Sequence, residues 1–430
     1  MPPKDTKQYC YRTSPPDIFS NLPENVIDEI LICLPFKDAV RTSILSKKWK
    51  YNWCRLPELT LDRTIWTSKK DFSLFSTSEI TYIIYHILIL HDGPITKFIL
   101  DVPRTRSCPK IDGLIYFLSM NGIQHLVLKL PLCGLNKLPC SLFTCFQLRH
   151  LTLENCLIHP PPAFNGFDRL ISLELHDVTI SSKFLESLIY HCPLLERLVL
   201  RIPQHLNVVE IKAPKLRSFK FTGSIQFITL KDVPLLAKLS LVDTGFVRAD
   251  NFDIAMFFES FISLELLHLD SDSIKFFARA GEVVPKRLPF DLICVKRLYL
   301  SEISLNGFKV ISFALCLIRS FPCLQYLEIQ VDEEDDDDYI RPTLICLEVE
   351  AFSDMTLNHL KTVKLRKISG TRLEMQLIKL LLAKSPALVT MVIDPHYTLN
   401  SRKYVKVEAE ISKFQRASSK AEVLYDVYYY

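Results

Sequence analysis

The chain has 430 residues, 48% of them hydrophobic, so it can bury several cores or one long continuous core. Its net charge is only +4, and without the seven consecutive acids at 332–338 the rest carries +11 spread along its length. Such dispersed charge gives no indication of a nucleic-acid partner.

The composition also bears on the compartment. The first twenty residues lack the basic start, apolar stretch and cleavage site of a secretory signal. The longest nearly uncharged apolar run, 80–90, is shorter than the about 20 residues that a bilayer span needs. The 13 cysteines form no CxxC pair, and several lie inside apolar runs. We therefore expect an intracellular protein of the cytoplasm or nucleus, with reduced core thiols and no membrane partner.

Glycine is scarce, with ten residues in the whole chain. Phosphate-binding loops and nucleophile elbows need glycine at fixed offsets. The sequence contains no GxGxxG, GxxxxGK[ST], GxSxG or HExxH motif. We therefore predict a protein that is not an enzyme, with no catalytic residue, no cofactor and no metal site.

The N-terminal part divides into a tail and a small helical unit. Residues 1–17 are polar and proline-rich, which predicts a disordered tail. From 18 to 55, Pro23 and Pro35 suit the starts of two helices, where a missing N–H does no harm. Such a short unit has too little core to be stable alone, so some of its apolar surface should meet a neighbour.

A third helix is predicted in this unit. Ser46 can cap its first turn, and Trp49 and Trp53 follow four residues apart on one face. The unit is thus expected to contain three helices in fewer than forty residues.

These residues resemble the F-box family, in its plant version. The resemblance rests on Leu34-Pro35, on the string Asp-Ala-Val-Arg-Thr-Ser at 38–43, on Leu45-Ser46 and on Trp49. It implies docking onto a Skp-type adaptor and, through the adaptor, onto a cullin. The residues expected to bind the adaptor are Leu22, Pro23, Ile27, Ile30, Leu31, Pro35, Val40 and Leu45.

An internal repeat dominates the rest of the chain. Its unit is an apolar residue, two variable residues, then an apolar, a variable and an apolar residue. From Leu148 onward the copies recur every 20 to 36 residues, which predicts one short strand per turn with outer segments of variable length. The first positions of the copies are Leu56, Ile95, Ile123, Leu148, Leu170, Leu195, Leu216, Leu236, Leu264, Val295, Leu324, Leu360 and Leu388.

The outer segments differ in kind. The stretch 201–214 contains Pro203 and several β-branched residues, so it is not expected to be helical. Helical spacing is found at 183–191, 253–261, 309–319 and 373–383. One strand per turn, backed by helices or loops, is typical of a leucine-rich-repeat solenoid with a concave parallel sheet. The predicted fold is therefore α/β, with an F-box at 18–55 and an irregular solenoid at 56–350.

Two features interrupt or end this solenoid. The acidic run at 332–338 is predicted to be an exposed loop, either a solvated insertion or a docking site for a basic partner. The segment 351–430 resembles the FBD module of plant F-box proteins, and its strand and helix pattern suggests a cap on the open end of the solenoid. The matching residues are those at 360–363, Ile368, Gly370, 374–382, 388–393 and 414–418.

Target recognition is expected on the concave sheet, where the variable positions of each strand point away from the core. The central turns are basic and the later ones aromatic, which suits an acidic or phosphorylated peptide. A solvated sheet without a ligand is the alternative. The histidines and acids there follow ordinary strand alternation and do not indicate catalysis. The candidate target-binding residues are His150, His176, Arg197, Arg201, Lys220, Lys238, His268, Arg297, Tyr299 and Tyr326.

The sequence thus predicts the substrate-recognition subunit of a Skp-cullin-F-box ubiquitin ligase. Its partners would be a Skp-type adaptor, through it a cullin, and an unknown protein target, with no nucleic acid and no membrane. Two alternatives stay open. One is a non-degradative scaffold whose F-box binds no adaptor. The other is a co-receptor that senses a small molecule, such as a hormone or an inositol phosphate, on the concave surface.

Overall fold

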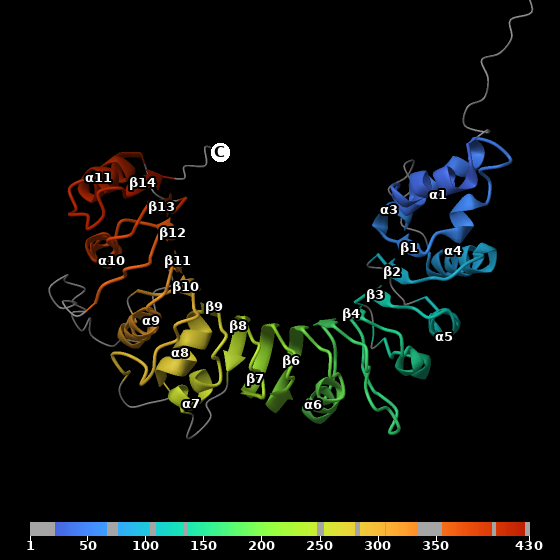
Figure 1. The fold of residues 1–430 in the computed structure, drawn as a ribbon, viewed down its shortest axis with the longest axis horizontal. Helices are drawn as coiled ribbons and strands as arrows, with labels where there is room; N and C mark the ends of the chain where they lie inside the picture. Colours follow the sequence, from blue (N-terminus) through green and yellow to red (C-terminus); the bar gives the residue numbers. More distant parts are fainter. Residues whose placement is uncertain are drawn as a thin grey trace, which may run out of the picture.

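The fold is seen in a computed structural model that describes residues 22–66, 76–103, 109–132, 134, 136–246, 253–279, 284–305, 307–332, 355–397 and 401–425. The expected tail at 1–17 and the acidic run after Asp332 lie outside these ranges. The described chain forms an open arc with the N-terminal helices at one end and the C-terminal helices at the other (Figure 1).

One parallel sheet runs through the whole arc. Its strands are hydrogen-bonded in the order of the sequence, from the first to the last. Their bounds are β1 Glu58–Leu61, β2 Lys97–Asp101, β3 His125–Lys129, β4 His150–Glu154, β5 Ser172–His176, β6 Arg197–Lys212, β7 Ser218–Lys231, β8 Lys238–Phe246, β9 Leu266–Asp270, β10 Arg297–Ile303, β11 Tyr326–Val331, β12 Thr362–Ile368, β13 Thr390–Pro395 and β14 Glu422–Tyr425. The solenoid prediction is confirmed.

The helices lie on the outer side of the arc and at its N-terminal end (Figure 1). Within the described ranges, none of them has the length and apolar content needed to cross a bilayer. Their bounds are α1 Glu24–Ile32, α2 Phe36–Arg41, η2 Thr42–Ile44, η3 Asn52–Arg55, α3 Arg63–Trp66, α4 Thr77–Leu90, α5 Asp112–Met120, η4 Cys140–Thr144, α6 Ser182–Tyr190, α7 Ile254–Glu259, α8 Ser271–Arg279, α9 Phe308–Ser320, α10 Arg372–Lys384 and α11 Ser401–Ile411.

The repeated apolar string forms the core beneath the sheet. Its fourth and sixth residues lie on strands β1 to β13 and point inward, because alternate strand residues face opposite sides. The register places Leu298 of β10 between Leu267 of β9 and Leu327 of β11, and all three are fully buried. Each turn therefore buries its leucines against the turns before and after it.

The central turns depart from the strand-and-helix pattern. The segment after Arg201 continues as strand, and β6 pairs with β7 a second time, from Leu206 with Ile225 onward. The prediction that 201–214 is not helical is confirmed. β-Branched residues such as Val209 and Ile211 favour this extended form, and both are buried.

In the N-terminal unit, α1 and α2 begin directly after Pro23 and Pro35, as predicted. The capping role predicted for Ser46 is wrong. The hydroxyl of Ser46 has no hydrogen-bond partner in the described part of the chain, and hydrogen-bonded turns followed by the 3₁₀ helix η3 replace a third α-helix. Tighter turns bring both Trp49 and Trp53 into the core, where they are 1% and 5% exposed.

Replacement of Phe258 by alanine tests the aromatic packing around α7. The ring is fully buried, and its centroid lies 5.2, 5.9 and 5.8 Å from those of Phe257, Phe261 and Phe277. Phe258→Ala should lower the free energy of unfolding by about 3–5 kcal/mol in urea denaturation. Met256→Ala, at a 71% exposed position of the same helix, should change it by less than about 0.5 kcal/mol. Equal effects would contradict this packing.

Substitutions at two glycines test whether a close contact adds to the cost of a left-handed backbone. Both Gly166 and Gly122 have positive φ, +92° and +69°. A Cβ on Gly166 would lie 2.0 Å from the carbonyl oxygen of His191, whereas one on Gly122 would meet nothing within 4 Å. Gly122→Ala should therefore cost only the about 1–2 kcal/mol of a left-handed residue. Gly166→Ala should lower the melting temperature, followed by circular dichroism, clearly further. Similar shifts would refute the close approach to His191.

Candidate protein-binding surfaces

The first candidate surface belongs to the unit formed by α1, α2, η2 and η3. Its core contains Phe36 and Trp53, whose rings meet edge to face at 5.9 Å. Ile27 and Leu31 also lie in this core, each 0% exposed. Both were expected to contact an adaptor. In the free chain their side chains pack inward, because they lie on the face of α1 that meets the aromatic core.

The other six expected adaptor residues lie nearer the surface. Pro23, Pro35 and Leu45 are exposed, with Leu45 at 54%, and the rest, Leu22, Ile30 and Val40, are partly buried. Their role in binding stays a prediction.

Three exposed apolar residues of this unit were missed. Val26, Ile32 and Ile44 are 37%, 58% and 87% exposed. Ile32 follows the buried Leu31, so the rotation of about 100° between successive helical residues carries it off the buried face of α1. That signal was available in the sequence. The exposure of Ile44 follows from the 3₁₀ geometry of η2, which the sequence pattern did not indicate.

Polar contacts hold this unit together and onto the solenoid. The guanidinium of Arg55 contacts Glu24 at 3.2 Å and Asp28 at 3.3 Å, and its hydrogen bond to Glu24 raises the pKa of the arginine. The backbone N–H of Asp92 donates to the carbonyl of Cys54 at 2.8 Å. The N-terminal unit is therefore fixed to the first turn of the arc.

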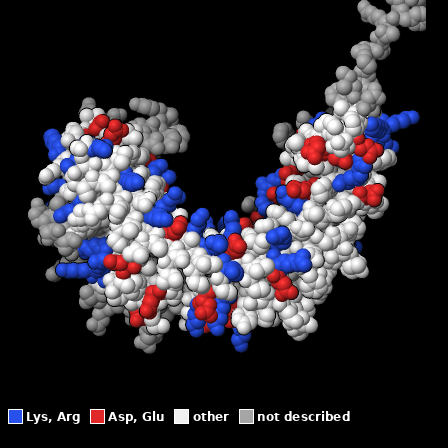
Figure 2. Space-filling view, in the orientation of Figure 1, with Lys and Arg blue, Asp and Glu red and all other residues white. Residues whose placement is uncertain are grey.

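The second candidate surface is the concave face of the sheet (Figure 2). The register arranges its outward residues in three rows, which run across the strands. The predicted target-binding residues occupy all three. The first concave row contains His150, Arg197, Lys238, Arg297 and Tyr326, the second Lys220, His268 and Tyr299, and the third His176 and Arg201.

These ten residues do not form one site. His150 on β4 and Arg297 on β10 are six strands apart, roughly 29 Å at the usual strand spacing. The aromatic members do gather, because the ring of Tyr299 lies 5.7 Å from that of His268 and 5.3 Å from that of Tyr326. No three His, Cys, Asp or Glu side chains of the described residues are grouped as a metal site requires.

Two of the predicted arginines are already paired within the chain. Arg197 contacts Glu174 at 3.2 Å, and Arg201 contacts Asp177 at 3.5 Å. Glu174 also lies 3.5 Å from His176. Lys220, Lys238 and Arg297 have no ion pair with any residue that the structure describes. Among the predicted cations, those without an ion pair therefore lie on β7, β8 and β10, in the C-terminal half of the concave face.

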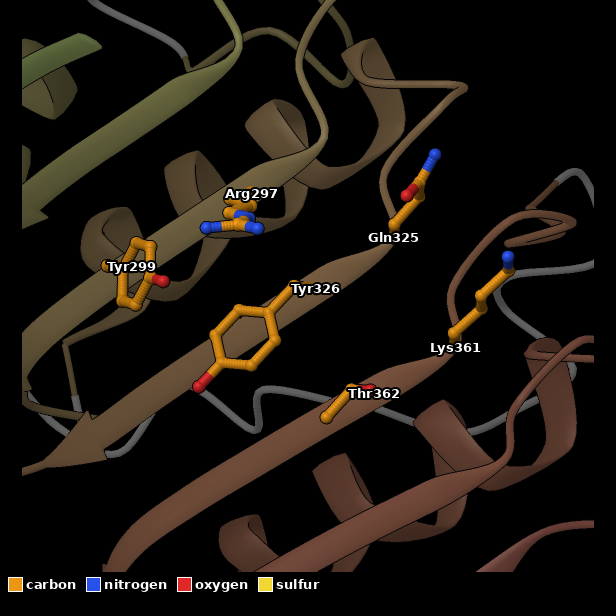
Figure 3. A pocket seen from close by; sticks show the side chains of 6 residues that line it. All are labelled: Arg297, Tyr299, Gln325, Tyr326, Lys361 and Thr362. Atoms are coloured by element: carbon orange, nitrogen blue, oxygen red, sulfur yellow. The ribbon is translucent and has the colours of Figure 1, made fainter.

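A hollow of about 380 Å³ lies on this half, across β10, β11 and β12 (Figure 3). Three of the residues that line the hollow belong to the predicted target-binding set, namely Arg297, Tyr299 and Tyr326. The other three, Gln325, Lys361 and Thr362, were not predicted. Gln325 and Lys361 immediately precede their strands and were not counted as concave positions. Their place at the hollow follows from the register.

Tyr326, which lines the hollow, belongs to a hydrogen-bonded network on β11 and β12. The hydroxyl of Tyr326 donates to Glu328 at 2.5 Å, and Arg366 contacts the same carboxylate at 2.6 Å. Burial raises the pKa of Tyr326, and the hydrogen bond to Glu328 acts in the same direction. The tyrosine hydroxyl is therefore held as a donor to its own chain.

Family models match the chain in three places. An F-box domain matches residues 19–60, the leucine-rich repeats of FBD-associated F-box protein At5g56370 match 111–329, and FBD matches 356–393. The FBD match includes β12 and α10, so this segment adds strands to the same sheet as the repeats.

Relatives from Arabidopsis thaliana match nearly the whole chain. F-box/FBD/LRR-repeat protein At1g13570 is 33% identical over 423 residues, which cover 95% of this chain and 98% of the relative. F-box/FBD/LRR-repeat protein At5g56420 is 24% identical over 437 residues, with coverage of 95% and 99%. The chain therefore belongs to the plant F-box/FBD/LRR-repeat family, as its motifs predicted.

Proposed function

We propose that this F-box protein is the substrate-recognition subunit of a Skp-cullin-F-box ubiquitin ligase and performs no catalytic step itself. The observation that carries the proposal is the F-box match at 19–60, on a unit that exposes large apolar side chains. In this proposal the F-box binds a Skp-type adaptor, and the concave face holds the protein target.

The exposed apolar residues favour a protein partner on energetic grounds. Ile32, Ile44 and Leu45 are all more than half exposed in a unit whose own core is already filled. Burying one such side chain against a partner contributes about 1.5–3 kcal/mol. A few residues of this kind can dominate an interface, and exposed apolar groups with helical neighbours suit a groove on another protein.

In this proposal the arc would hold the adaptor and the target at a limited distance from each other. The F-box unit lies at one end and the concave face opens beside it (Figure 1). Because the unit is bonded to the first turn through Asp92 and Cys54, a bound target would stay at a limited distance from the adaptor. Such tethering raises the effective concentration of target lysines near a ubiquitin-charged enzyme.

Charge substitutions at the exposed apolar residues test adaptor binding. Ile44→Asp and Leu45→Asp should each weaken the capture of a purified Skp-type adaptor about tenfold or more, because a carboxylate must lose water in an apolar interface. The melting temperature should not fall, since Ile44 is 87% and Leu45 54% exposed. Ile262→Asp is the matched control, because Ile262 is 67% exposed and lies far along the arc, before β9.

The outcome distinguishes the ligase subunit from a scaffold. Full adaptor capture by Ile44→Asp and Leu45→Asp would show that binding does not use these residues. A folded wild-type chain that captures no Skp-type adaptor would reject the ligase assignment and favour a non-degradative scaffold.

A further inference from the structure

We propose that the hollow across β10, β11 and β12 is a subsite for a phosphoserine or phosphothreonine side chain in an extended segment of the protein target. The inference deepens the proposed function and rests on it, because the concave face is taken to hold the target. Three features of the concave face support it: the distribution of charge, the partners of the nearby carboxylates, and the unpaired donors around the hollow.

Charge on the three concave rows differs between the first six strands and the next six. On β1 to β6, these rows contain four cations and four carboxylates, namely Lys97, Lys129, Arg197 and Arg201 with Glu58, Asp101, Glu154 and Glu174. On β7 to β12, they contain five cations and two carboxylates, namely Lys220, Lys238, Arg297, Lys364 and Arg366 with Asp270 and Glu328. Of the last two strands, β14 adds the carboxylate of Glu422 to the first row. Lysine and arginine side chains can be seen along the inner edge of the arc in Figure 2. The stretch from β7 to β12, which contains the hollow, is therefore net positive and attracts anions.

The two carboxylates on β7 to β12, those of Asp270 and Glu328, already have partners within the chain. Glu328 accepts from Tyr326 and contacts Arg366, as described above. Asp270 is 4% exposed and accepts a hydrogen bond from the backbone N–H of Ser273 at 2.9 Å. Both carboxylates therefore have partners other than Arg297.

The donors around the hollow, by contrast, are free. The side chains of Arg297, Gln325, Lys361 and Thr362 make no hydrogen bond or ion pair with any other residue that the structure describes. Arg297 and Thr362 flank Tyr326 in the first concave row, two strands apart, which corresponds to roughly 10 Å. Figure 3 shows the side chains of Arg297, Tyr326 and Thr362 on three neighbouring strands, with Gln325 and Lys361 at the starts of the second and third.

This set of donors fits a phosphate group better than a carboxylate. A phosphorylated side chain carries a charge of about −1.5 to −2 and three acceptor oxygens, whereas aspartate or glutamate has one charge and two oxygens. Two cations, an amide and a hydroxyl from three successive turns can therefore all be used by one phosphate. Only two cations, Arg297 and Lys361, line the hollow itself, and these are few for an inositol polyphosphate, which has several phosphates to neutralise.

The aromatic side chains next to the hollow give the subsite a direction. The rings of Tyr326, Tyr299 and His268 follow one another across β11, β10 and β9 at centroid distances of 5.3 and 5.7 Å. An extended target segment with its phosphate at Arg297 and Lys361 could lay a neighbouring apolar residue on these rings. The ligand class is therefore a phosphorylated residue close to an apolar one.

Degenerate peptide pools test the subsite on the full chain in complex with its Skp-type adaptor. Fluorescein-labelled pools carry a fixed central phosphoserine, serine or glutamate between randomised flanks, and fluorescence polarisation measures their binding. The phosphoserine pool should bind about tenfold tighter than the other two. Arg297→Ala and Lys361→Ala should each remove about tenfold. The matched control is Arg372→Ala, which removes an exposed arginine at the start of α10, a helix on the outer side of the arc, and should leave binding unchanged.

Each other result overturns the inference. Equal binding of the serine and phosphoserine pools would exclude a phosphate subsite. Equal binding of the glutamate and phosphoserine pools would show that the hollow recognises any acidic side chain. An equal loss in Arg372→Ala would show that the loss of binding is not specific to the hollow. Tight binding of inositol hexakisphosphate without any peptide preference would indicate a small-molecule site. Adaptor capture is measured in parallel, so that retained capture without phosphoserine preference rejects this inference alone, while lost capture rejects the proposed function.

Discussion

The stacking of apolar side chains beneath a parallel sheet is the constraint on which this structure depends. A single turn has only a few inward residues and cannot form a core by itself. Leu298 is buried because Leu267 and Leu327 lie on either side of it, and the same relation repeats from strand to strand. Stability is therefore shared along the arc, and the sheet needs cover at its ends. The F-box unit lies at the first strand and the FBD segment extends the last ones.

Because the inner face of each strand maintains the fold, the outer face is free to vary. The chain uses this freedom unevenly. Arg197 and Arg201 are paired with acids in the N-terminal half, whereas Lys238 and Arg297 have no such pair among the described residues. Near the hollow, Glu328 is bound by its own chain. The cations without an ion pair therefore lie on the later strands of the concave face.

The F-box unit has a core too small to cover all of its apolar side chains. Its small core is made by Phe36, Trp49 and Trp53, and this leaves Ile32 and Ile44 in contact with water. Exposed apolar residues are unfavourable in isolation and favourable in an interface. Since the unit is hydrogen-bonded to the first turn, the F-box end and the concave face are parts of one continuous arc.

The sequence by itself determined the elements whose pattern is local. The apolar string predicted β1 to β13, and proline and motif residues predicted α1, α2 and the family. It missed β14, which has no buried residue and is held by main-chain pairing with β13. Only the tertiary structure decided that Ile27 is core and Ile44 surface, and that Lys361 lies beside Gln325. Residue periodicity specifies which side faces inward, whereas the pairing of turns of unequal length decides which residues become neighbours.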